Sequence, residues 1–392
     1  MHVAVVGAGI GGLTLAAALI RDGLTCQVFE QTPVLEEVGA GIQLAPNAVR
    51  VLGGLGLNQQ LRLAAVRPEA LEMRRWDDNT VLRRTELGAR CEEMYGAPYY
   101  TVHRAELHRR LLEQLPSGTV HLGLRCIDLR QRPREVELAF ENGFHEHADV
   151  VVGADGIHST VRDRLVPDQP RFSGQTIYRA LVPADRVPFL LEEPKVVLWL
   201  GPRQHCVSYP ISGDSLVSLG ATTPGEDWQT ESWSAKGRPE DLRARYAAWH
   251  PQVRELTAGV DMVSRWALYD RDPLPRWSDQ RMTVLGDAAH PMLPFFAQGA
   301  NQAIEDAAVL ATCLRQAETA GVVAALARYE QIRRPRTEEV HRISRANTVA
   351  LHLPDGAEQR RRDEALAAGA ALRDQEWLFG YDAERVALAA TA

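Results

Sequence analysis

Cysteine is scarce in this chain of 392 residues, and its spacing excludes two kinds of cross-link. The five cysteines include no Cys-x-x-Cys pair, and their number is odd. Structural zinc sites and disulfide frameworks need paired, regularly spaced cysteines. We therefore expect no metal site and no disulfides, and a cytoplasmic location, where thiols stay reduced.

An excess of positive charge is also missing. The formal net charge is −7 at pH 7, with 44 basic and 51 acidic side chains. Nucleic-acid surfaces need clustered cations, so we expect no nucleic-acid partner. The three consecutive arginines at 360–362 are interpreted as the solvated face of a helix.

One long uncharged run, residues 3–20, raises the question of a membrane segment. Four glycines interrupt the run, it lacks a basic flank, and no small-residue cleavage site follows. These features argue against a signal peptide or membrane helix. A buried strand, a tight turn and a buried helix explain the run better, so we expect no membrane partner.

The first thirty residues predict a βαβ unit: a strand at 2–6, a helix at 13–21 and a strand at 25–30. The turn between the first two, GAGIGG at 7–12, fits the G-x-G-x-x-G pattern. In that pattern Gly7 permits the turn, Gly9 lets the backbone approach a pyrophosphate, and Gly12 lets helix and strand pack. The unit predicts a parallel sheet with a right-handed crossover.

Glu30 ends the second strand, where it can accept hydrogen bonds from ribose hydroxyls. The N-terminus of the helix offers N–H groups to phosphates. The pattern predicts a dinucleotide site, but it does not separate FAD from NAD.

Two later glycine-rich turns extend this prediction. In DVVVGADGIHSTVR (149–162), Asp155 either binds a nucleotide or locks the turn before a helix, and both readings stay open. In LGDAAHPMLP (285–294), Asp287 can accept a hydrogen bond from a ribityl hydroxyl, and we expect a structural role for His290. The helix that begins near residue 299 can stabilise negative charge on a reduced isoalloxazine ring through its amides.

Residues 170–275 differ in composition and pattern from the nucleotide-binding stretches. They contain several prolines and short strand-like runs at 195–200, 206–210 and 215–221. They predict an antiparallel sheet between two nucleotide-binding stretches. Residues 320–392 are expected to be mostly helical, and the chain has no internal repeats. We expect further elements as helices at 47–55, 107–115 and 301–317, strands at 120–124, 136–140, 148–152 and 281–285, and a hairpin turn at 76–79.

Together these motifs resemble the FAD-dependent aromatic hydroxylases, which have the para-hydroxybenzoate hydroxylase fold. Within that family the chain looks most like salicylate hydroxylases, 3-hydroxybenzoate 6-hydroxylases and 6-hydroxynicotinate 3-monooxygenases. The segments that carry this resemblance are GAGIQLAPNAVR (39–50), YTVHRAELHRRL (100–111), residues 271–311 and WLFGYDA (377–383). A second G-x-G-x-x-G is missing, as in the family, which usually has no separate nicotinamide domain.

The resemblance implies an α/β fold. A Rossmann-like FAD-binding domain of the GR2 type is expected to interleave with a mostly antiparallel β-sheet substrate domain, followed by a C-terminal helical segment. The expected divisions are 1–72, 97–170 and 276–350 for the FAD-binding domain, 73–96 and 171–275 for the substrate domain, and 351–392 for the helical segment.

The resemblance also implies the chemistry. FAD would be bound non-covalently, NADH or NADPH would be the transient electron donor, and O2 would form a flavin C4a-hydroperoxide that hydroxylates a small aromatic substrate. We expect a salicylate- or 3-hydroxybenzoate-like acid as substrate, and a monomer or homodimer. The positions expected to bind the cofactor are Gly7, Gly9, Ile10, Gly11, Gly12, Glu30, Gln31, Gly41, Ile42, Gln43, Arg104, Cys126, Asp155, Gly286, Asp287, Pro294, Gly299, Ala300 and Asn301.

A phenol ordinarily ionises near pH ~10, so its activation at neutral pH needs a base or a hydrogen-bond partner. His205 and Tyr209 are four residues apart on an expected strand and therefore share one face. By the resemblance, His205 is the base or proton relay and Tyr209 is its partner. The alternative is a structural histidine beside a core tyrosine.

The resemblance implies three further kinds of substrate contact. Gln298 is expected to orient the substrate, with helix N-capping as the alternative, and Pro294 to turn its carbonyl toward it. Phe295 and Phe296 would wall the pocket, although plain packing explains them equally. Arg179 is a candidate for binding a carboxylate, with a structural role as the alternative.

One departure and several alternatives bear on the substrate. Gln43 stands where hydroxynicotinate enzymes carry a histidine, which favours a benzenoid acid over a pyridine. Alternatives are a tailoring oxygenase for a larger aromatic product, a decarboxylating hydroxynicotinate-type enzyme, and a flavin-binding carrier, which would not oxidise NADH faster with an aromatic acid. A halogenase is disfavoured because its Trp-x-Trp-x-Ile segment is missing.

Overall fold

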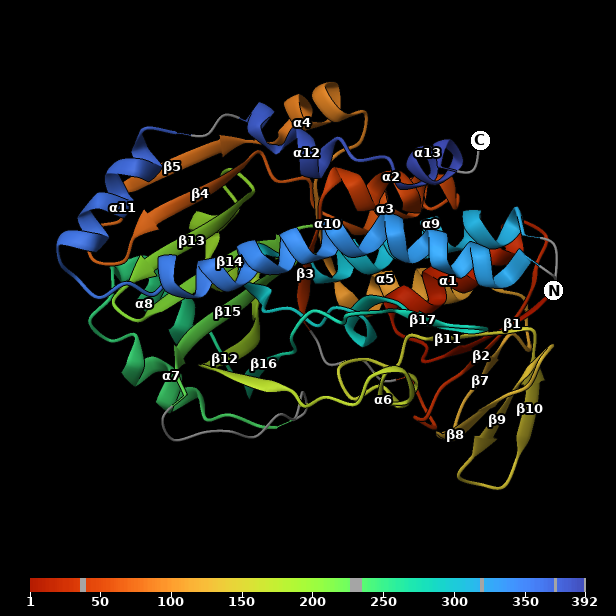
Figure 1. Ribbon diagram of the computed structural model, residues 1–392. Coiled ribbons are helices and arrows are strands. Elements are labelled where there is room, and N and C mark those ends of the chain that lie inside the picture. Colours follow the sequence, from red (N-terminus) through yellow and green to blue (C-terminus); the bar gives the residue numbers. More distant parts are fainter. Residues whose placement is uncertain (36–39, 226–234, 318–320, 370–371, 391–392) are drawn as a thin grey trace.

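The valine-rich strand β1 (His2–Val6) lies near the centre of a six-stranded sheet because both of its faces can be buried. The computed structural model describes residues 1–35, 40–225, 235–317, 321–369 and 372–390 (Figure 1). The order of the sheet is β17-β18-β11-β1-β2-β7, parallel except for the β17–β18 pair. Its other strands are β2 (Thr25–Phe29), β7 (Val120–His121), β11 (Val150–Gly153), β17 (Ser278–Asp279) and β18 (Met282–Val284).

Helices cover this sheet and enclose the larger core. Helix α1 packs on α9, and α9 packs on α10, which runs along much of the molecule toward the second large sheet (Figure 1). These helices, with α5 below α1, are α1 (Ile10–Arg21), α5 (Arg104–Glu113), α9 (Gly299–Arg315) and α10 (Val322–Ala350). A three-stranded antiparallel sheet and a short helix flank this part: β8 (Cys126–Gln131), β9 (Val136–Phe140), β10 (His145–Ala148) and α6 (Thr160–Leu165).

The second large sheet has seven strands in the order β16-β12-β15-β14-β13-β4-β5, antiparallel except for the β4–β13 pair. Two helices cover one face, where Trp199, Tyr246 and Trp249 form a separate core. The strands and these helices are β4 (Ala70–Arg75), β5 (Val81–Glu86), β12 (Arg171–Pro183), β13 (Lys195–Gly201), β14 (Gln204–Ile211), β15 (Leu216–Pro224), β16 (Ser264–Asp270), α7 (Pro239–Arg245) and α8 (Pro251–Ala258).

The remaining helices and strands are smaller. They are β3 (Gly41–Leu44) paired with β6 (Tyr100–His103), α2 (Pro46–Gly54), α3 (Asn58–Ala64), α4 (Gly88–Tyr95), α11 (Ala357–Ala367), α12 (Glu376–Phe379) and α13 (Ala383–Ala389). Short 3₁₀ turns complete the described chain: η1 (Ala184–Arg186), η2 (Pro188–Leu190), η3 (Gly286–Ala288), η4 (Pro294–Phe296) and η6 (Leu372–Gln375). Among the described helices, none combines the length and the apolar character needed to cross a bilayer.

The expected fold class is confirmed, and several elements have the expected bounds. The strands at 2–6 and 136–140 match β1 and β9, and the hairpin turn at 76–79 joins β4 to β5. The expected strand at 120–124 is wrong beyond residue 121, where β7 ends. The thirteen-residue strand β12 was missed, because a bulge between Phe172 and Thr176 breaks its alternation.

The division into domains remains a proposal. Strand β4 begins at Ala70 and therefore lies across the expected boundary between residues 72 and 73. Residues 226–234, within the stretch expected to form the antiparallel sheet, lie outside the described residues.

A buried ion network joins α9 to α10. Arg333 is fully buried and pairs with Glu305 and, at 2.7 Å, with Asp306. Arg336 also pairs with Glu305, at 2.7 Å. Burial opposes ionisation, yet His290 and Arg333 hold the pKa of Asp306 down at about 2. These charges therefore depend on one another for stability.

We predict that Arg333→Ala lowers the free energy of unfolding by about 3–5 kcal/mol, because it leaves two buried carboxylates short of their partner. Thermal unfolding measures the loss. The matched control is Arg342→Ala on the same helix, whose exposed pair with Glu339 should contribute little to stability. Equal shifts in the two variants would show that the network does not join the helices.

Candidate active site

A cavity of about 340 Å³ lies between the first sheet and the face of the seven-stranded sheet opposite α7 and α8. Glycine-rich turns of the first sheet line one end, and strands β12, β14 and β16 line the other. Of the residues expected in the site, the cavity lining includes Gly9, Ile10, Gly11, Gly41, Ile42, Gln43, Arg104, Arg179, His205, Tyr209, Gly286, Asp287, Pro294, Phe295, Gln298, Gly299 and Ala300.

The turn before α1 is built for close approach of a ligand to the backbone. Gly7 has φ +105°, and a side chain there would clash with the carbonyl of Ala154. A side chain on Gly12 would clash with the carbonyl of Gly7. A Cβ on Gly9, by contrast, would meet no atom within 4 Å. Gly7 and Gly12 therefore close the turn, and Gly9 leaves open space at the N-terminus of α1.

Glu30 lies beside this turn but outside the cavity lining. One carboxylate oxygen accepts from the backbone N–H of Ala8 at 2.9 Å, and the other accepts from that of Thr32 at 2.9 Å. These bonds hold the carboxylate at the end of β2, where an adenosine ribose is expected. Gln31 is exposed next to it and does not line the cavity.

Asp155 and Cys126 do not line the cavity either. Asp155 accepts from the hydroxyl of Ser159 and from the backbone N–H of Thr160 at 2.8 Å, so it locks the turn before α6. Burial raises the pKa of Asp155 to about 6, although these bonds oppose the rise. Cys126 is buried in β8, and burial raises the pKa of its thiol to about 12.

Asp287 supplies a carboxylate to the lining of the cavity. It is accessible from the cavity, although it lies deep in the molecule. Burial raises its pKa, while the positive charge of Arg104 and the ring of His290 oppose the rise. A carboxylate in this position can accept a hydrogen bond from a ligand hydroxyl. Arg104 begins α5 and also lines the cavity.

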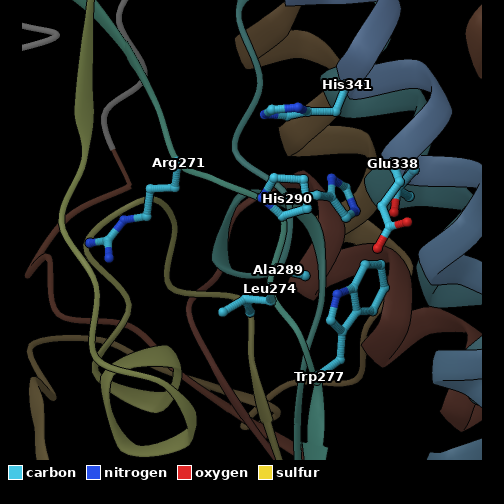
Figure 2. A pocket seen from close by; sticks show the side chains of 9 residues that line it. Arg271, Leu274, Trp277, Ala289, His290, Glu338 and His341 are labelled. Carbon is cyan, nitrogen blue, oxygen red and sulfur yellow. The ribbon is translucent and has the colours of Figure 1, made fainter.

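His290 has a structural position behind this turn. Its Nε2 lies 2.6 Å from Asp306, which also accepts from the backbone N–H of Gly286 at 2.9 Å. A second cavity of only about 10 Å³, room for about one water, lies beside His290, between Trp277 and His341 (Figure 2). The buried Nδ1 of His290 and Nε2 of His341 have no hydrogen-bond partner. Such a cavity is too small for an organic ligand.

The side chain of Asn301 holds two neighbouring elements together. Its side-chain N–H₂ donates to the carbonyls of Gln43 and Ala297 at 3.0 and 2.9 Å, and its oxygen accepts from the backbone N–H of Ala45 at 2.8 Å. Asn301 therefore fixes β3 against α9 and does not line the cavity. In this way it positions Gln43, whose oxygen accepts from the hydroxyl of Tyr99 at 2.7 Å.

The far end of the cavity is formed by the face of the seven-stranded sheet opposite α7 and α8. On β14, Cys206 enters the core under α7 and α8, while His205, Val207 and Tyr209 line the cavity. This is the two-residue period of a strand. Across β15, Gly220 pairs with both Val207 and Arg179, and its missing side chain leaves room between them.

The ring of His205 is held from behind. Its Nδ1 lies 2.8 Å from Nε2 of His352 and 3.1 Å from the hydroxyl of Thr222. Burial, together with His352 and Arg179, lowers the pKa of His205 well below its ordinary value. The imidazole is therefore neutral at physiological pH.

Gln298 is also oriented by buried partners. The N–H₂ of Asn47 donates to Glu305 at 2.6 Å and to the side-chain oxygen of Gln298 at 3.3 Å. Gln302 donates to the same oxygen at 3.3 Å. With its oxygen occupied, Gln298 has its N–H₂ left for the cavity. The alternative of helix N-capping is wrong, because its side chain makes no cap hydrogen bond.

The two neighbouring phenylalanines, Phe295 and Phe296, lie in different surroundings. Phe295 lines the cavity and meets His205 edge-to-face, with ring centroids 5.6 Å apart. Phe296 does not line it; the ring stacks on Trp377 with centroids 6.4 Å apart, so the expected pocket role is wrong for Phe296. Pro294 lines the cavity, but its carbonyl accepts from the N–H of Ala297 at 3.1 Å.

Several lining residues were missed from the sequence. Ile177 and Trp266 face the cavity from β12 and β16, and Val207 lies between the two residues that were expected on β14. The two-residue period would have found Val207 and, had β12 been recognised, Ile177. His352 and Gly220 carry no sequence signal, because strand pairing and the end of α10 bring them to the site.

Comparison with known proteins places this geometry in a family. The family described as FAD binding domain matches residues 1–344. A 3-amino-4-hydroxybenzoate 2-monooxygenase of Streptomyces platensis is 52% identical over 385 residues, covering 98% of this chain and 97% of that protein. A 6-hydroxynicotinate 3-monooxygenase of Pseudomonas fluorescens is 35% identical over 391 residues, covering 99% and 96%. A salicylate hydroxylase substrate complex matches with a TM-score of 0.85 at 28% identity, covering 100% and 98%.

The chain therefore belongs to the FAD-binding-domain family of flavin-dependent hydroxylases, and the resemblance seen in the sequence is confirmed. It is an FAD-dependent aromatic monooxygenase, with NAD(P)H as its electron donor. The cavity fits this cofactor: the backbone is open at Gly9, Asp287 can bind a ribityl hydroxyl, and the first residues of α9 face the cavity.

We predict that Asp287→Ala weakens FAD binding about 10- to 100-fold, since a hydrogen bond to a charged group contributes about 1.5–3 kcal/mol. Flavin absorbance after desalting, and titration of the apoprotein with FAD, measure the loss. Asp185→Ala, an exposed carboxylate outside the cavity, is the control and should keep its FAD. Full retention of FAD by Asp287→Ala would contradict the contact.

Proposed function

We propose that this enzyme hydroxylates an aminohydroxybenzoate, with 3-amino-4-hydroxybenzoate as the first candidate, at the ring carbon between the carboxylate-bearing and amino-bearing carbons. NAD(P)H and O2 are the co-substrates. The observation that carries the proposal is the cavity end that combines a cation, Arg179, with the oriented polar groups of His205 and Gln298. The 52% identical relative, which is named for this substrate, supports it.

Arg179 is suited to bind the carboxylate. It lines the cavity from β12, one guanidinium N–H donates to the carbonyl of Gly41 at 3.4 Å, and its buried Nε has no partner. A buried N–H without a partner costs free energy, and a carboxylate would remove that cost. We therefore propose the substrate role for Arg179 over the structural one.

The sheet geometry suits a substrate with polar groups at opposite ends of one ring. Arg179 and Val207 both pair with Gly220, so they are two strands apart, and His205 is two residues further along β14. At standard strand spacings, the Cα atoms of Arg179 and His205 are then about 12 Å apart. Both side chains enter the cavity, which leaves between them the length of a single substituted ring.

The electronic demand of the reaction also suits these side chains. The proposed ring carbon is ortho to the amino group, so the nitrogen lone pair is what activates it toward an electrophilic oxygen. When bound, FAD takes hydride from NAD(P)H and activates O2 for transfer of one oxygen atom. His205 can accept a hydrogen bond from the amino N–H or the neighbouring hydroxyl, and Gln298 can donate one to the substrate.

We infer that the enzyme acts in the cytoplasm as a monomer or homodimer. All five cysteines are free and buried, which is typical of a protein from a reducing compartment.

We predict that 3-amino-4-hydroxybenzoate stimulates NAD(P)H oxidation and gives one hydroxylated product per NAD(P)H. The panel should include 4-hydroxybenzoate, salicylate, 3-hydroxybenzoate and 6-hydroxynicotinate, each tested with NADH and NADPH, with product identified by mass and NMR. Conversion of another acid in its place would refute the substrate assignment. Oxidation that no aromatic acid stimulates would refute the hydroxylase function.

We predict that Arg179→Met raises KM for the substrate about 10- to 100-fold, with a smaller change in kcat, because a charge-assisted hydrogen bond contributes about 1.5–3 kcal/mol. The carboxamide analogue of the substrate should lose the same factor in the wild type and nothing further in the variant. Arg171→Met, an exposed arginine at the start of the same strand, is the control. A variant that still distinguishes carboxylate from carboxamide would exclude Arg179 as the clamp.

A further inference from the structure

Behind His205 lies a second buried histidine, His352, two residues beyond the end of α10. The two rings stack with centroids 4.9 Å apart, and His205 Nδ1 lies 2.8 Å from His352 Nε2. His352 does not line the cavity. It can therefore act on the substrate only through His205.

The hydrogen bond that His352 makes with its other ring nitrogen fixes the direction of the bond between the two histidines. His352 Nδ1 lies 2.7 Å from the backbone carbonyl of Thr348, which can only accept, so Nδ1 carries the proton. A neutral imidazole has one N–H, so His352 Nε2 is an acceptor. His205 must then donate from Nδ1, which leaves a bare lone pair on His205 Nε2.

Both rings are neutral, as this reasoning requires. Burial, with a smaller contribution from Arg362 on α11, lowers the pKa of His352 to about 4, although the carbonyl of Thr348 opposes the shift. Burial, with His352 and Arg179, also lowers the pKa of His205. The other polar neighbour is the hydroxyl of Thr222, which lies 3.1 and 3.2 Å from the facing nitrogens. No carboxylate lies among these described partners to draw a proton onto the pair.

We propose that His352 is a positioning residue that holds His205 in the Nδ1–H tautomer, so that its Nε2 lone pair faces the substrate and accepts a hydrogen bond from the substrate's N–H or O–H. The opposite tautomer would present a donor and would compete for the lone pair that activates the ring. This inference rests on the proposed function for its substrate, but the tautomer itself does not depend on the substrate's identity.

The end of α10 is built into the cavity wall, which keeps His352 in place. Ser344 donates to the carbonyl of Leu293 at 2.5 Å, and Asn347 donates to the carbonyl of Phe295 at 2.9 Å. The ring of Phe295 meets the edge of His352 at 5.1 Å as well as that of His205. The same helix end therefore carries the supporting histidine and anchors the loop that walls the substrate.

The test compares His352→Gln with His352→Met. Glutamine has an oxygen close to the position of Nε2 and can still accept from His205, whereas methionine has similar length without a comparable acceptor. We expect His352→Met to lower the rate of hydroxylation about 10- to 100-fold and to divert NAD(P)H oxidation to peroxide. His352→Gln should stay within a few-fold of the wild type in both. FAD content and thermal midpoint show whether each variant is folded.

The direct readout is the ¹⁵N NMR spectrum of the FAD-loaded protein with labelled histidine, recorded without substrate. The signal of His205, assigned by its loss in His205→Asn, should show Nδ1 protonated and Nε2 bare in the wild type and in His352→Gln, but not in His352→Met. A wild-type spectrum with Nε2 protonated would overturn the proposal, as would a folded His352→Met variant with wild-type coupling. Because this arm needs no turnover, a wrong substrate assignment cannot be mistaken for a wrong role of His352.

Discussion

The rest of this structure depends on two adjacent buried acids of α9, Glu305 and Asp306. Asp306 accepts from the backbone of Gly286 and from His290, so it sets the turn that carries Asp287. Glu305 accepts from Asn47, which in turn orients Gln298. Buried carboxylates need cations, and both arginines that pair with Glu305 come from α10. One charge network therefore connects the helix framework, the turn that carries Asp287 and a polar group of the cavity wall.

The same helix, α10, serves both ends of the cavity. Arg333 neutralises the acids beside the first sheet, while the far end of the helix supports the face of the seven-stranded sheet (Figure 1). Two polar groups of the cavity wall, Gln298 and His205, then have a fixed direction of hydrogen bonding. Gln298 presents its N–H₂ because its oxygen accepts from Asn47, which also donates to the carboxylate of Glu305. His205 presents a lone pair because it donates to His352, which itself donates to the backbone carbonyl of Thr348.

Motifs that are local in the sequence predicted the local structure well. The turn at Gly7 and Gly12 needs only residues that are near each other in the chain, and β1 and α1 form around it. The sharing of one face by His205 and Tyr209 follows from the strand period alone. Where a residue had a local partner available, as Asp155 had in the turn before α6, the sequence left two readings, and the contacts favour the structural one.

Local spacing in the sequence was enough to predict the first βαβ unit, the glycine turn that opens the backbone to a dinucleotide, and the strand face that carries His205, because each of these features depends on a few neighbouring residues. Three features came from the packing of distant elements: Phe296 lies outside the cavity lining, Asn47 orients Gln298, and His352 contacts His205. Asn47 and Gln298 are 251 positions apart in the chain, and His205 and His352 are 147 apart. A local sequence pattern carries no information on contacts between elements so far apart.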